Sequence, residues 1–260
     1  MSYLWTPEQI RGHYPTPYSL PFRHMTALAT FATTEEFSRS VLPPCLEPAP
    51  DPTLSVSAMA FMDWRNGVPS VAQRDRAAMV GINAVHDGEE GLYCLTVIET
   101  EEINIEKGRE LWGMPKKLGA VDLFDDGKDL YAFVDRKHHR LVELRGTLGA
   151  AEQVDPAETH HAVYFELRGY LAPTGMSMSN PQLVITDIET NLHRSQPLVD
   201  VDLTLFESPF DPGVATIPVG AFRDGVNVAG VDNYKIREVV ELEGDGHDYA
   251  PYVLGRFYSA

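Results

Sequence analysis

From residue 53 onward, short runs rich in apolar residues are separated by turn-forming residues, a pattern typical of β-strands. The turns are short, as at 125–128 and 135–138, which favours antiparallel hairpins over crossover helices. We therefore predict a mainly β (α+β) fold, a closed or strongly curved antiparallel β-barrel with a few short helices. The predicted strands are 53–61, 77–86, 91–99, 120–124, 130–135, 141–147 and 162–171, with others near 182–193, 199–207 and 234–242.

Two segments carry helical patterns. Residues 33–37, Thr-Thr-Glu-Glu-Phe, resemble a capping box and predict a short helix that ends before Pro43. The charges within residues 100–111 are compatible with a short amphipathic helix. Residues 1–22 contain four prolines, which suit an extended arm lying on the body or on a partner subunit. Because no linker interrupts the rest, we expect one domain over residues 1–260.

Charge narrows the choice of partners. The chain has 38 acidic and 21 basic residues, a net charge of -17, which repels nucleic acid and anionic membranes. Neither is expected to be a partner. An anionic substrate would also be repelled at long range, so a site for one needs local positive charge. Lys116, Lys117, Arg109 and the Arg23-His24 pair could supply it.

Cysteine usage and hydropathy bear on the compartment. The two cysteines, Cys45 and Cys94, are too few for a disulfide scaffold and fit a reducing compartment. No apolar run reaches the roughly 18 residues that a membrane span needs, and the start lacks a basic region followed by an apolar run. We therefore expect a soluble cytoplasmic protein.

The segment 108–117 carries the candidate chemistry, because Lys116 and Lys117 follow Pro115 in apolar, glycine-punctuated surroundings. To attack a carbonyl, an amine must lose its proton, and an ordinary lysine pKa of about 10.4 leaves only about one in a few thousand neutral at pH 7. Lys117 at roughly 6 to 7 Å could lower the pKa of Lys116 by nearly two units. On a strand the two side chains would point apart, so burial must supply most of the shift.

Lys116 is thus a candidate Schiff-base nucleophile, and the alternative is a pair of solvated surface lysines. Spacing alone favours that alternative.

A family resemblance changes this balance. Residues 108–111 and 115–119 resemble the signature of the acetoacetate decarboxylase family, in which the first lysine of the pair forms the Schiff base. That enzyme is a known example of a lysine activated by desolvation or by a neighbouring cation. The likeness extends over roughly residues 20–242, with weaker matches at 41–46, 181–187, 205–206 and 217–219. It implies a decarboxylase-like barrel, catalysis by Lys116 with Lys117, an oxo-acid substrate, no cofactor and a homo-oligomer.

Two positions depart from the pattern of decarboxylating members of the family. Gln73 stands where a glutamate is expected, and His24, with Arg23 beside it, stands where an arginine is expected. Gln73 keeps hydrogen-bonding capacity but cannot act as a base. Because a slip of one residue turns a strand side chain to the other face, either His24 or Arg23 could face the substrate. The alternative for Gln73 is a solvated surface residue.

Four further residues of the motif are candidate pocket residues. Trp112 lies four residues before Lys116 and could set substrate size, or could simply pack in the core. Met114 would contribute an apolar side chain to the pocket wall in either case. We expect Arg109 and Glu110 to form an ion pair that stiffens the site or touches Lys117.

Other site classes find no support in the sequence. The adjacent pairs His138-His139 and His160-His161 lack partners at ligand spacing, so no metal site is predicted. Neither a phosphate-binding glycine loop nor a serine-hydrolase elbow occurs. Three functions stay open: decarboxylation of a β-keto acid through an imine at Lys116, aldol, dehydration or hydration chemistry through the same imine, and a non-catalytic binding barrel.

Overall fold

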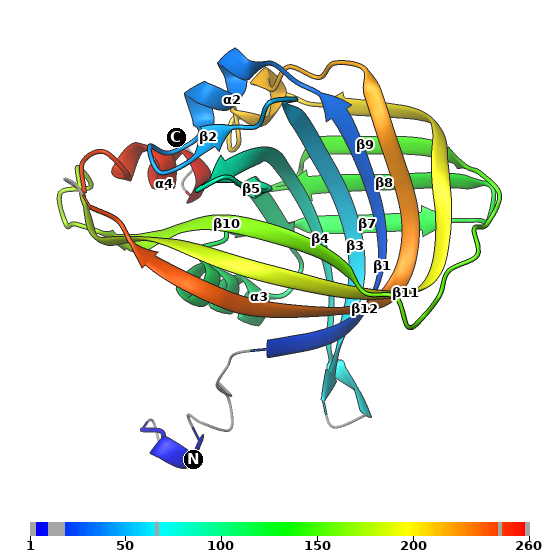
Figure 1. The fold of residues 1–260 in the computed structure, drawn as a ribbon, viewed down its shortest axis with the longest axis horizontal. Helices are drawn as coiled ribbons and strands as arrows, with labels where there is room; N and C mark the ends of the chain where they lie inside the picture. Colours follow the sequence, from blue (N-terminus) through cyan, green and yellow to red (C-terminus); the bar gives the residue numbers. More distant parts are fainter. Residues whose placement is uncertain (1–3, 10–18, 66–67, 244–245, 258–260) are drawn as a thin grey trace.

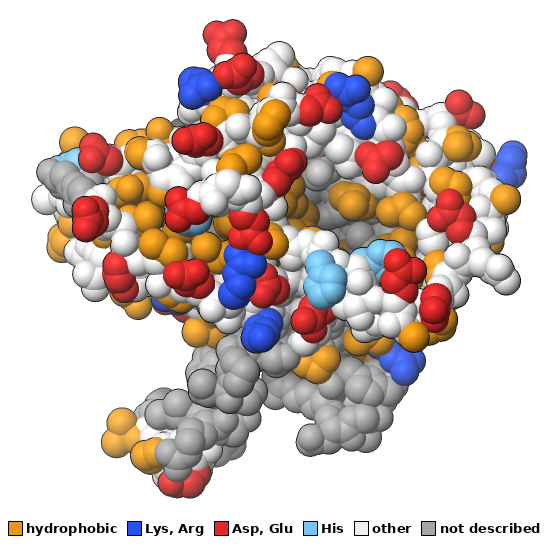
Figure 2. Space-filling model, viewed as in Figure 1, with side chains coloured by type: hydrophobic (Ala, Val, Ile, Leu, Met, Phe, Trp, Pro, Cys, Tyr) orange, Lys and Arg blue, Asp and Glu red, His pale blue; other side chains and the backbone are white. Residues whose placement is uncertain are grey.

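The computed structural model describes residues 4–9, 19–65, 68–243 and 246–257. The predicted arm at 1–22 lies mostly outside these ranges, and its last four residues belong to a strand instead. Within the described ranges, no helix is long and apolar enough to cross a membrane. The cytoplasmic location stays a prediction. Acidic side chains are spread over the face seen in Figure 2, in keeping with the net charge of -17.

Twelve strands dominate the described chain (Figure 1). They are β1 (Ser19–Ala32), β2 (Glu47–Pro48), β3 (Thr53–Arg65), β4 (Val68–His86), β5 (Glu89–Glu99), β6 (Lys116–Leu118), β7 (Ala120–Asp125), β8 (Asp129–Arg136), β9 (His139–Leu148), β10 (His160–Leu171), β11 (Met178–Leu205) and β12 (Phe222–Glu241). The helical segments are α2 (Glu35–Val41), α3 (Glu102–Lys107), the π-helical turn η1 (Gly108–Trp112), the 3-10 turn η2 (Val214–Thr216) and α4 (Ala250–Phe257).

The main path of the sheet runs β10-β5-β4-β3-β1-β12-β11-β9-β8-β7, and β10 also pairs with β11. Long strands curve strongly across the molecule (Figure 1). The prediction of a mainly β protein with a few short helices is confirmed, whereas a closed barrel stays a prediction. Pairing is antiparallel except between β5 and β6 and between β5 and β10. The expectation of antiparallel pairing throughout was therefore wrong at β5, because α3 and η1 carry the chain back to enter β6 in the same direction.

The helix predicted from residues 33–37 is confirmed as α2. Thr34 caps it, since its hydroxyl oxygen accepts a hydrogen bond from the Phe37 N–H at 3.1 Å. The helix ends at Val41, two residues before the proline. Helix α3 confirms the second prediction over a shorter range, and its continuation as the π turn η1 was not predicted.

The larger remaining differences from the sequence prediction concern β1, β11 and α4. Strand β1 was missed, although it lies between β3 and β12 near the middle of the sheet. The strands predicted near 182–193 and 199–207 are parts of one strand, β11, whose pairing registers shift along its length. The C-terminal helix α4 was not predicted.

Alternation along the strands separates the core from a second apolar space. On β3, Val56 and Ala58 are buried in the main core, while Ser57 and Met59 line a cavity on the other face. On β4, Ala78 belongs to the same core cluster. In this region β3 and β4 are therefore covered on both faces. The cavity that they line is shielded from water, and a polar side chain inside it would be buried.

Candidate active site

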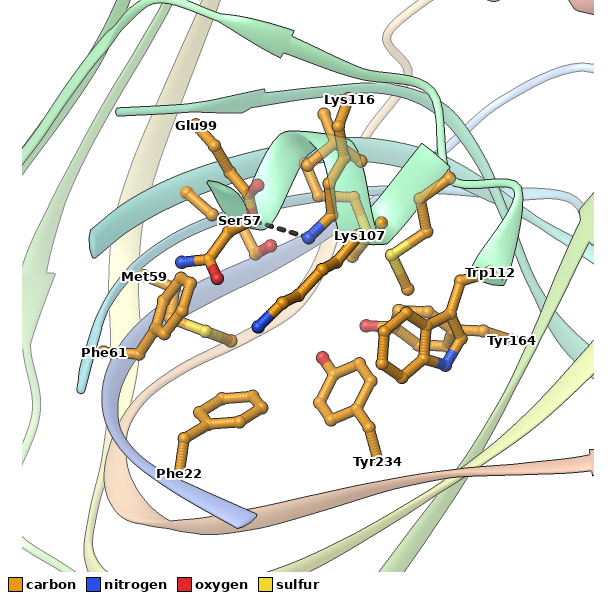
Figure 3. A pocket seen from close by; sticks show the side chains of 16 residues that line it. Phe22, Ser57, Met59, Phe61, Glu99, Lys107, Trp112, Lys116, Tyr164 and Tyr234 are labelled. Atoms are coloured by element: carbon orange, nitrogen blue, oxygen red, sulfur yellow. Dashed lines mark hydrogen bonds and ion pairs between the residues drawn. The ribbon is translucent and has the colours of Figure 1, made fainter. Parts of the chain in front are cut away.

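A cavity of about 90 Å³ lies between the sheet face of β3, β4 and β5 and the helical segment α3–η1 (Figure 3). Two tyrosines from β10 and β12 complete its wall. The apolar and aromatic lining residues are Phe22, Met59, Phe61, Ala77, Met79, Val97, Trp112, Met114, Tyr164 and Tyr234. The remaining lining residues are Ser57, Glu99, Asn104, Lys107, Gly108 and Lys116.

Strand pairing carries Lys116 into this cavity. Strand β6 pairs in parallel with β5, and Lys116 stands beside Val97. Since side chains alternate between faces, Lys116 shares its face with Val97 and Glu99. The Lys116 Nζ donates a hydrogen bond of 2.6 Å to Glu99 Oε1, and the exposed fractions of the two side chains are 14% and 2%. Lys116 is therefore a largely buried amine paired with a buried carboxylate, and the alternative of a solvated surface lysine was wrong.

Lys117 points to the opposite face of β6. Its Nζ donates to Asp211 Oδ1 at 2.7 Å, and Arg136 donates to the other oxygen of the same carboxylate at 2.6 Å. Burial lowers the pKa of Lys117, and the bond to Asp211 opposes that shift. Lys117 is not among the residues that line the Lys116 cavity. Its predicted catalytic part, as a cation facing Lys116, is therefore not supported by the geometry.

Gly108 makes room for the lysine. A Cβ at Gly108 would lie 2.2 Å from Lys116 Cδ and 2.4 Å from Cε. The Lys116 side chain thus crosses the helix backbone at the one kind of residue that leaves space for it. The π turn η1 begins at this glycine, in line with the tendency of such turns to occur at functional sites.

The end of η1 is fixed by a second glycine. Gly113 adopts a φ of +73°, a left-handed conformation that glycine takes without strain. A Cβ there would also lie 2.8 Å from the Leu167 carbonyl oxygen. Arg168 Nη1 donates to the Leu111 carbonyl oxygen at 2.6 Å and holds η1 against β10. This turn places Trp112 and Met114 in the cavity wall, where they also pack in a buried apolar cluster with Val184, so both readings of Trp112 apply.

The charged groups of the cavity include two that sequence reasoning missed. Burial raises the pKa of Glu99, and the neighbouring Lys116 cation opposes that shift. The second oxygen of Glu99, Oε2, is buried without a hydrogen-bond partner among the described residues. Lys107, which is 8% exposed, extends from the end of α3 into the space near Phe22, Met59 and Tyr234 (Figure 3). A second lysine therefore shares the cavity with Lys116.

Aromatic rings form the far wall. The Phe22 ring lies 5.2 Å from the Phe61 ring and 5.1 Å from the Tyr234 ring, measured between centroids. Tyr164 packs edge-on against Tyr234 at 6.1 Å. Burial raises the pKa of both tyrosines, so their hydroxyl groups stay protonated at neutral pH. The wall can therefore offer hydrogen-bond donors but no additional negative charge.

The two candidates for the position of the family arginine, Arg23 and His24, differ in burial. Arg23 is exposed, whereas His24 is buried on the strand face that Phe22 also occupies. His24 Nδ1 lies 2.7 Å from Thr26 Oγ1, and Nε2 lies 3.1 Å from Asp232 Oδ1. Neither residue is among the lining residues of the Lys116 cavity.

Two other predicted residues, Arg109 and Glu110, do not line the cavity, and a third, Gln73, cannot be placed. Glu110 is exposed on η1 and Arg109 is half-buried, and neither lines the cavity. The side chain of Gln73 lies outside the described residues. No local sequence pattern pointed to Lys107 or Glu99 as cavity residues. A parallel β5–β6 pair could have pointed to Glu99, but the prediction of antiparallel pairing concealed it.

Most of the chain matches a known protein family. The family model described as acetoacetate decarboxylase (ADC) matches residues 6–226. The chain belongs to the acetoacetate decarboxylase family. No curated protein matches it.

Solved structures show the same fold at low sequence identity. An acetoacetate decarboxylase from Legionella pneumophila is 15% identical with a TM-score of 0.71, over 94% of this chain and 98% of that one. An acetoacetate decarboxylase-like enzyme from Sphingomonas wittichii is 16% identical with a TM-score of 0.71, over 94% and 99%. The enduracididine biosynthesis enzyme MppR, complexed with the condensation product of pyruvate and imidazole 4-carboxaldehyde, is 16% identical with a TM-score of 0.68, over 90% and 91%. At these identities the fold is shared, and the reaction has to be argued from the site.

Proposed function

We propose that this member of the acetoacetate decarboxylase family is a lysine Schiff-base lyase that acts on a small oxo acid, with Lys116 as the nucleophile. The observation that carries the proposal is the 2.6 Å contact between Lys116 Nζ and Glu99 Oε1 in a cavity walled mainly by apolar side chains. A buried amine needs a proton acceptor before it can attack a carbonyl. Glu99 supplies one within hydrogen-bond reach.

Imine formation follows from this pair. Glu99 accepts a proton from the Lys116 ammonium, and the neutral amine attacks the ketone carbon to give a carbinolamine. The protonated Glu99 then returns the proton to the carbinolamine hydroxyl, which leaves as water and yields the protonated imine. The raised pKa of Glu99 suits a group that must hold a proton in one step and release it in the next. Glu99 thereby takes the acid–base role that Gln73 cannot perform.

The imine is the electron sink for bond breaking. In decarboxylation, the bond to the carboxylate breaks, its electron pair moves into the protonated imine, carbon dioxide leaves and an enamine remains. The enamine carbon takes up a proton, and water then hydrolyses the imine to release a ketone. The protonated hydroxyl groups of Tyr164 and Tyr234 line the cavity and are candidate proton donors for this step.

One observation favours the second candidate function, imine chemistry in which the substrate keeps its carboxylate. A buried lysine cation stabilises a carboxylate more than the neutral carbon dioxide that decarboxylation forms, which raises the barrier to that step. Lys107 occupies the Lys116 cavity and is suited to bind the substrate carboxylate in this way. The aromatic wall would accept a flat second reactant, and MppR was captured with a condensation product of pyruvate and an aldehyde. Aldol, dehydration or hydration chemistry on a 2-oxo acid is therefore the alternative.

Borohydride trapping tests the proposal. Incubation with pyruvate or acetoacetate followed by borohydride should add the mass of the reduced substrate to the peptide that contains Lys116. Lys116→Ala should abolish labelling, whereas the exposed Lys128 provides a matched control, Lys128→Ala. Labelling of Lys107 instead, or of no lysine with either substrate, would refute the proposal and favour a non-catalytic binding protein. Carbon dioxide release in parallel distinguishes decarboxylation from the alternative.

A further inference from the structure

A second cavity, of about 540 Å³, lies behind the Lys116 strand and is lined from α2, β5, β6, the segment around η2 and α4. We propose that it is a second binding site, for a small carboxylic acid with an apolar body. Its charged lining residues are Lys117, Asp211 and Arg256. None of the residues assigned to the imine chemistry lines it, so this proposal does not depend on the proposed reaction.

The charge balance at the back of this cavity favours an anion. Three buried or nearly buried cations lie there: Lys117, Arg136 and Arg256. Arg136 does not line the cavity itself, but it binds the same carboxylate, Asp211, as Lys117. Two carboxylates face them: Asp211, and Glu166, which accepts from Arg256 Nη1 at 3.0 Å. The ion pairs described here thus set three cations against two carboxylates in a region shielded from water. A bound monoanion would add a further negative group to this cluster.

A buried hydroxyl group provides a second, independent indication. Thr96 is 7% exposed, lines the cavity, and its Oγ1 is buried without a hydrogen-bond partner among the described residues. Leaving such a group unsatisfied costs about 1–3 kcal/mol. It stands on β5, the strand that pairs with the Lys117 strand. A carboxylate oxygen bound near Lys117 could accept a hydrogen bond from this hydroxyl.

The apolar lining residues and the volume of the cavity indicate the size and polarity of the rest of the ligand. Phe37, Val41, Leu95 and Ile217 contribute apolar surface. At about 540 Å³ against about 90 Å³, the rear cavity holds a larger molecule than the front one. A medium-chain or aromatic carboxylic acid fits both the charge and the apolar walls.

The position of Lys117 connects this site to the front cavity. Lys117 and Lys116 are neighbours on a strand of three residues, β6. A carboxylate that draws the Lys117 ammonium away from Asp211 would shift β6 and with it the contact between Lys116 and Glu99. Binding at the rear should therefore change the rate of borohydride trapping at the front.

Calorimetric titration with sodium octanoate tests the site. We expect saturable binding of octanoate and at least tenfold weaker binding of octanol, which lacks the charge. Thr96→Val, which keeps the shape of the side chain, should weaken octanoate binding several-fold, and Lys116→Ala should leave it unchanged because octanoate has no ketone. Loss of binding in Lys116→Ala would place the ligand in the front cavity and overturn the proposal.

A variant that fills the rear cavity tests the site without disturbing the ion pair between Lys117 and Asp211. Gly213 lines the rear cavity, and a Cβ there would have no atom within 4 Å, so Gly213→Leu can be accommodated. It should abolish octanoate binding while the thermal unfolding temperature stays near that of the wild type. Unchanged binding in both Gly213→Leu and Thr96→Val, or no saturable binding to the wild type, would refute the proposal. Because trapping of pyruvate at Lys116 is measured separately, failure of this site and failure of the proposed function give different results.

Discussion

Lys116 and Lys117 are adjacent in the sequence, yet their ammonium groups bind different carboxylates on opposite faces of β6, Glu99 and Asp211. The cation that shares the cavity with Lys116 is Lys107, nine residues earlier in the chain. The groups beside the Lys116 amine are therefore the buried carboxylate of Glu99 and Lys107 from the preceding helix, in place of the second lysine of the motif.

The pairing of Lys117 predicts a structural role for it. Lys117→Met should lower the free energy of unfolding by about 3 kcal/mol, because it removes one of the two cations, Lys117 and Arg136, that pair with the buried Asp211. Denaturant unfolding measures this change, with Lys128→Met as the exposed control. An unfolding free energy equal to that of the wild type would show that the Lys117–Asp211 pair adds nothing to stability.

Glu99 should govern imine formation. Glu99→Gln keeps a hydrogen-bonding group of the same shape but cannot take the proton of Lys116, so the rate of imine formation should fall by about 10²–10⁴-fold. Single-turnover trapping with borohydride measures the rate. The variant also leaves the Lys116 ammonium without the Glu99 carboxylate, so its free energy of unfolding should fall by about 3 kcal/mol. A rate within threefold of the wild type would remove Glu99 from the mechanism.

Gly108 is predicted to control the position of the Lys116 amine. In Gly108→Ala the new methyl group would overlap Lys116 Cδ and Cε, and a flexible side chain can move away at little cost in stability. Trapping at Lys116 should fall at least tenfold while the fold is kept, as judged by circular dichroism. Gly213→Ala is the matched control, because a Cβ there has no atom within 4 Å. Full activity in Gly108→Ala would mean that Lys116 works from another position.

Lys107 should act on the substrate carboxylate. Lys107→Met keeps the apolar stem and removes the charge, so KM for an oxo acid should rise at least tenfold. Trapping of acetone, a ketone without a carboxylate, should change less than threefold. Equal losses for the two substrates would indicate that Lys107 affects Lys116 itself instead of the carboxylate.

Glu166 should make stability depend on pH. Burial raises its pKa from 4.5 to about 7, with Arg256 opposing the shift. Because the folded state then holds a proton that the unfolded state has lost, this group favours folding at low pH and its contribution is lost as the pH rises from 4.5 to about 7. Glu166→Gln should flatten the unfolding free energy over that range. A slope equal to that of the wild type would assign the pH dependence to other groups.

The sequence by itself determined the local features. The runs of apolar residues specified most of the strands, Thr34 specified the start of α2, and the residues around Lys116 specified a lysine motif of the acetoacetate decarboxylase family. These inferences succeed because turn chemistry, capping and short motifs depend on neighbouring residues. Strand β1 escaped this reasoning, since its place in the sheet depends on pairing with β3 and β12 rather than on its own pattern.

Only the tertiary structure decided which groups surround the Lys116 amine. Glu99 reaches Lys116 because β5 and β6 pair in parallel, and Lys107 enters the cavity because α3 continues into a π turn before that pairing. Tyr164 and Tyr234 come from strands far along the chain, so no local spacing could relate them to Lys116. The same pairing turns Lys117 to the other face, since successive residues of a strand point in opposite directions. Long-range strand register, which a sequence pattern constrains only weakly, therefore sets the chemistry of this site.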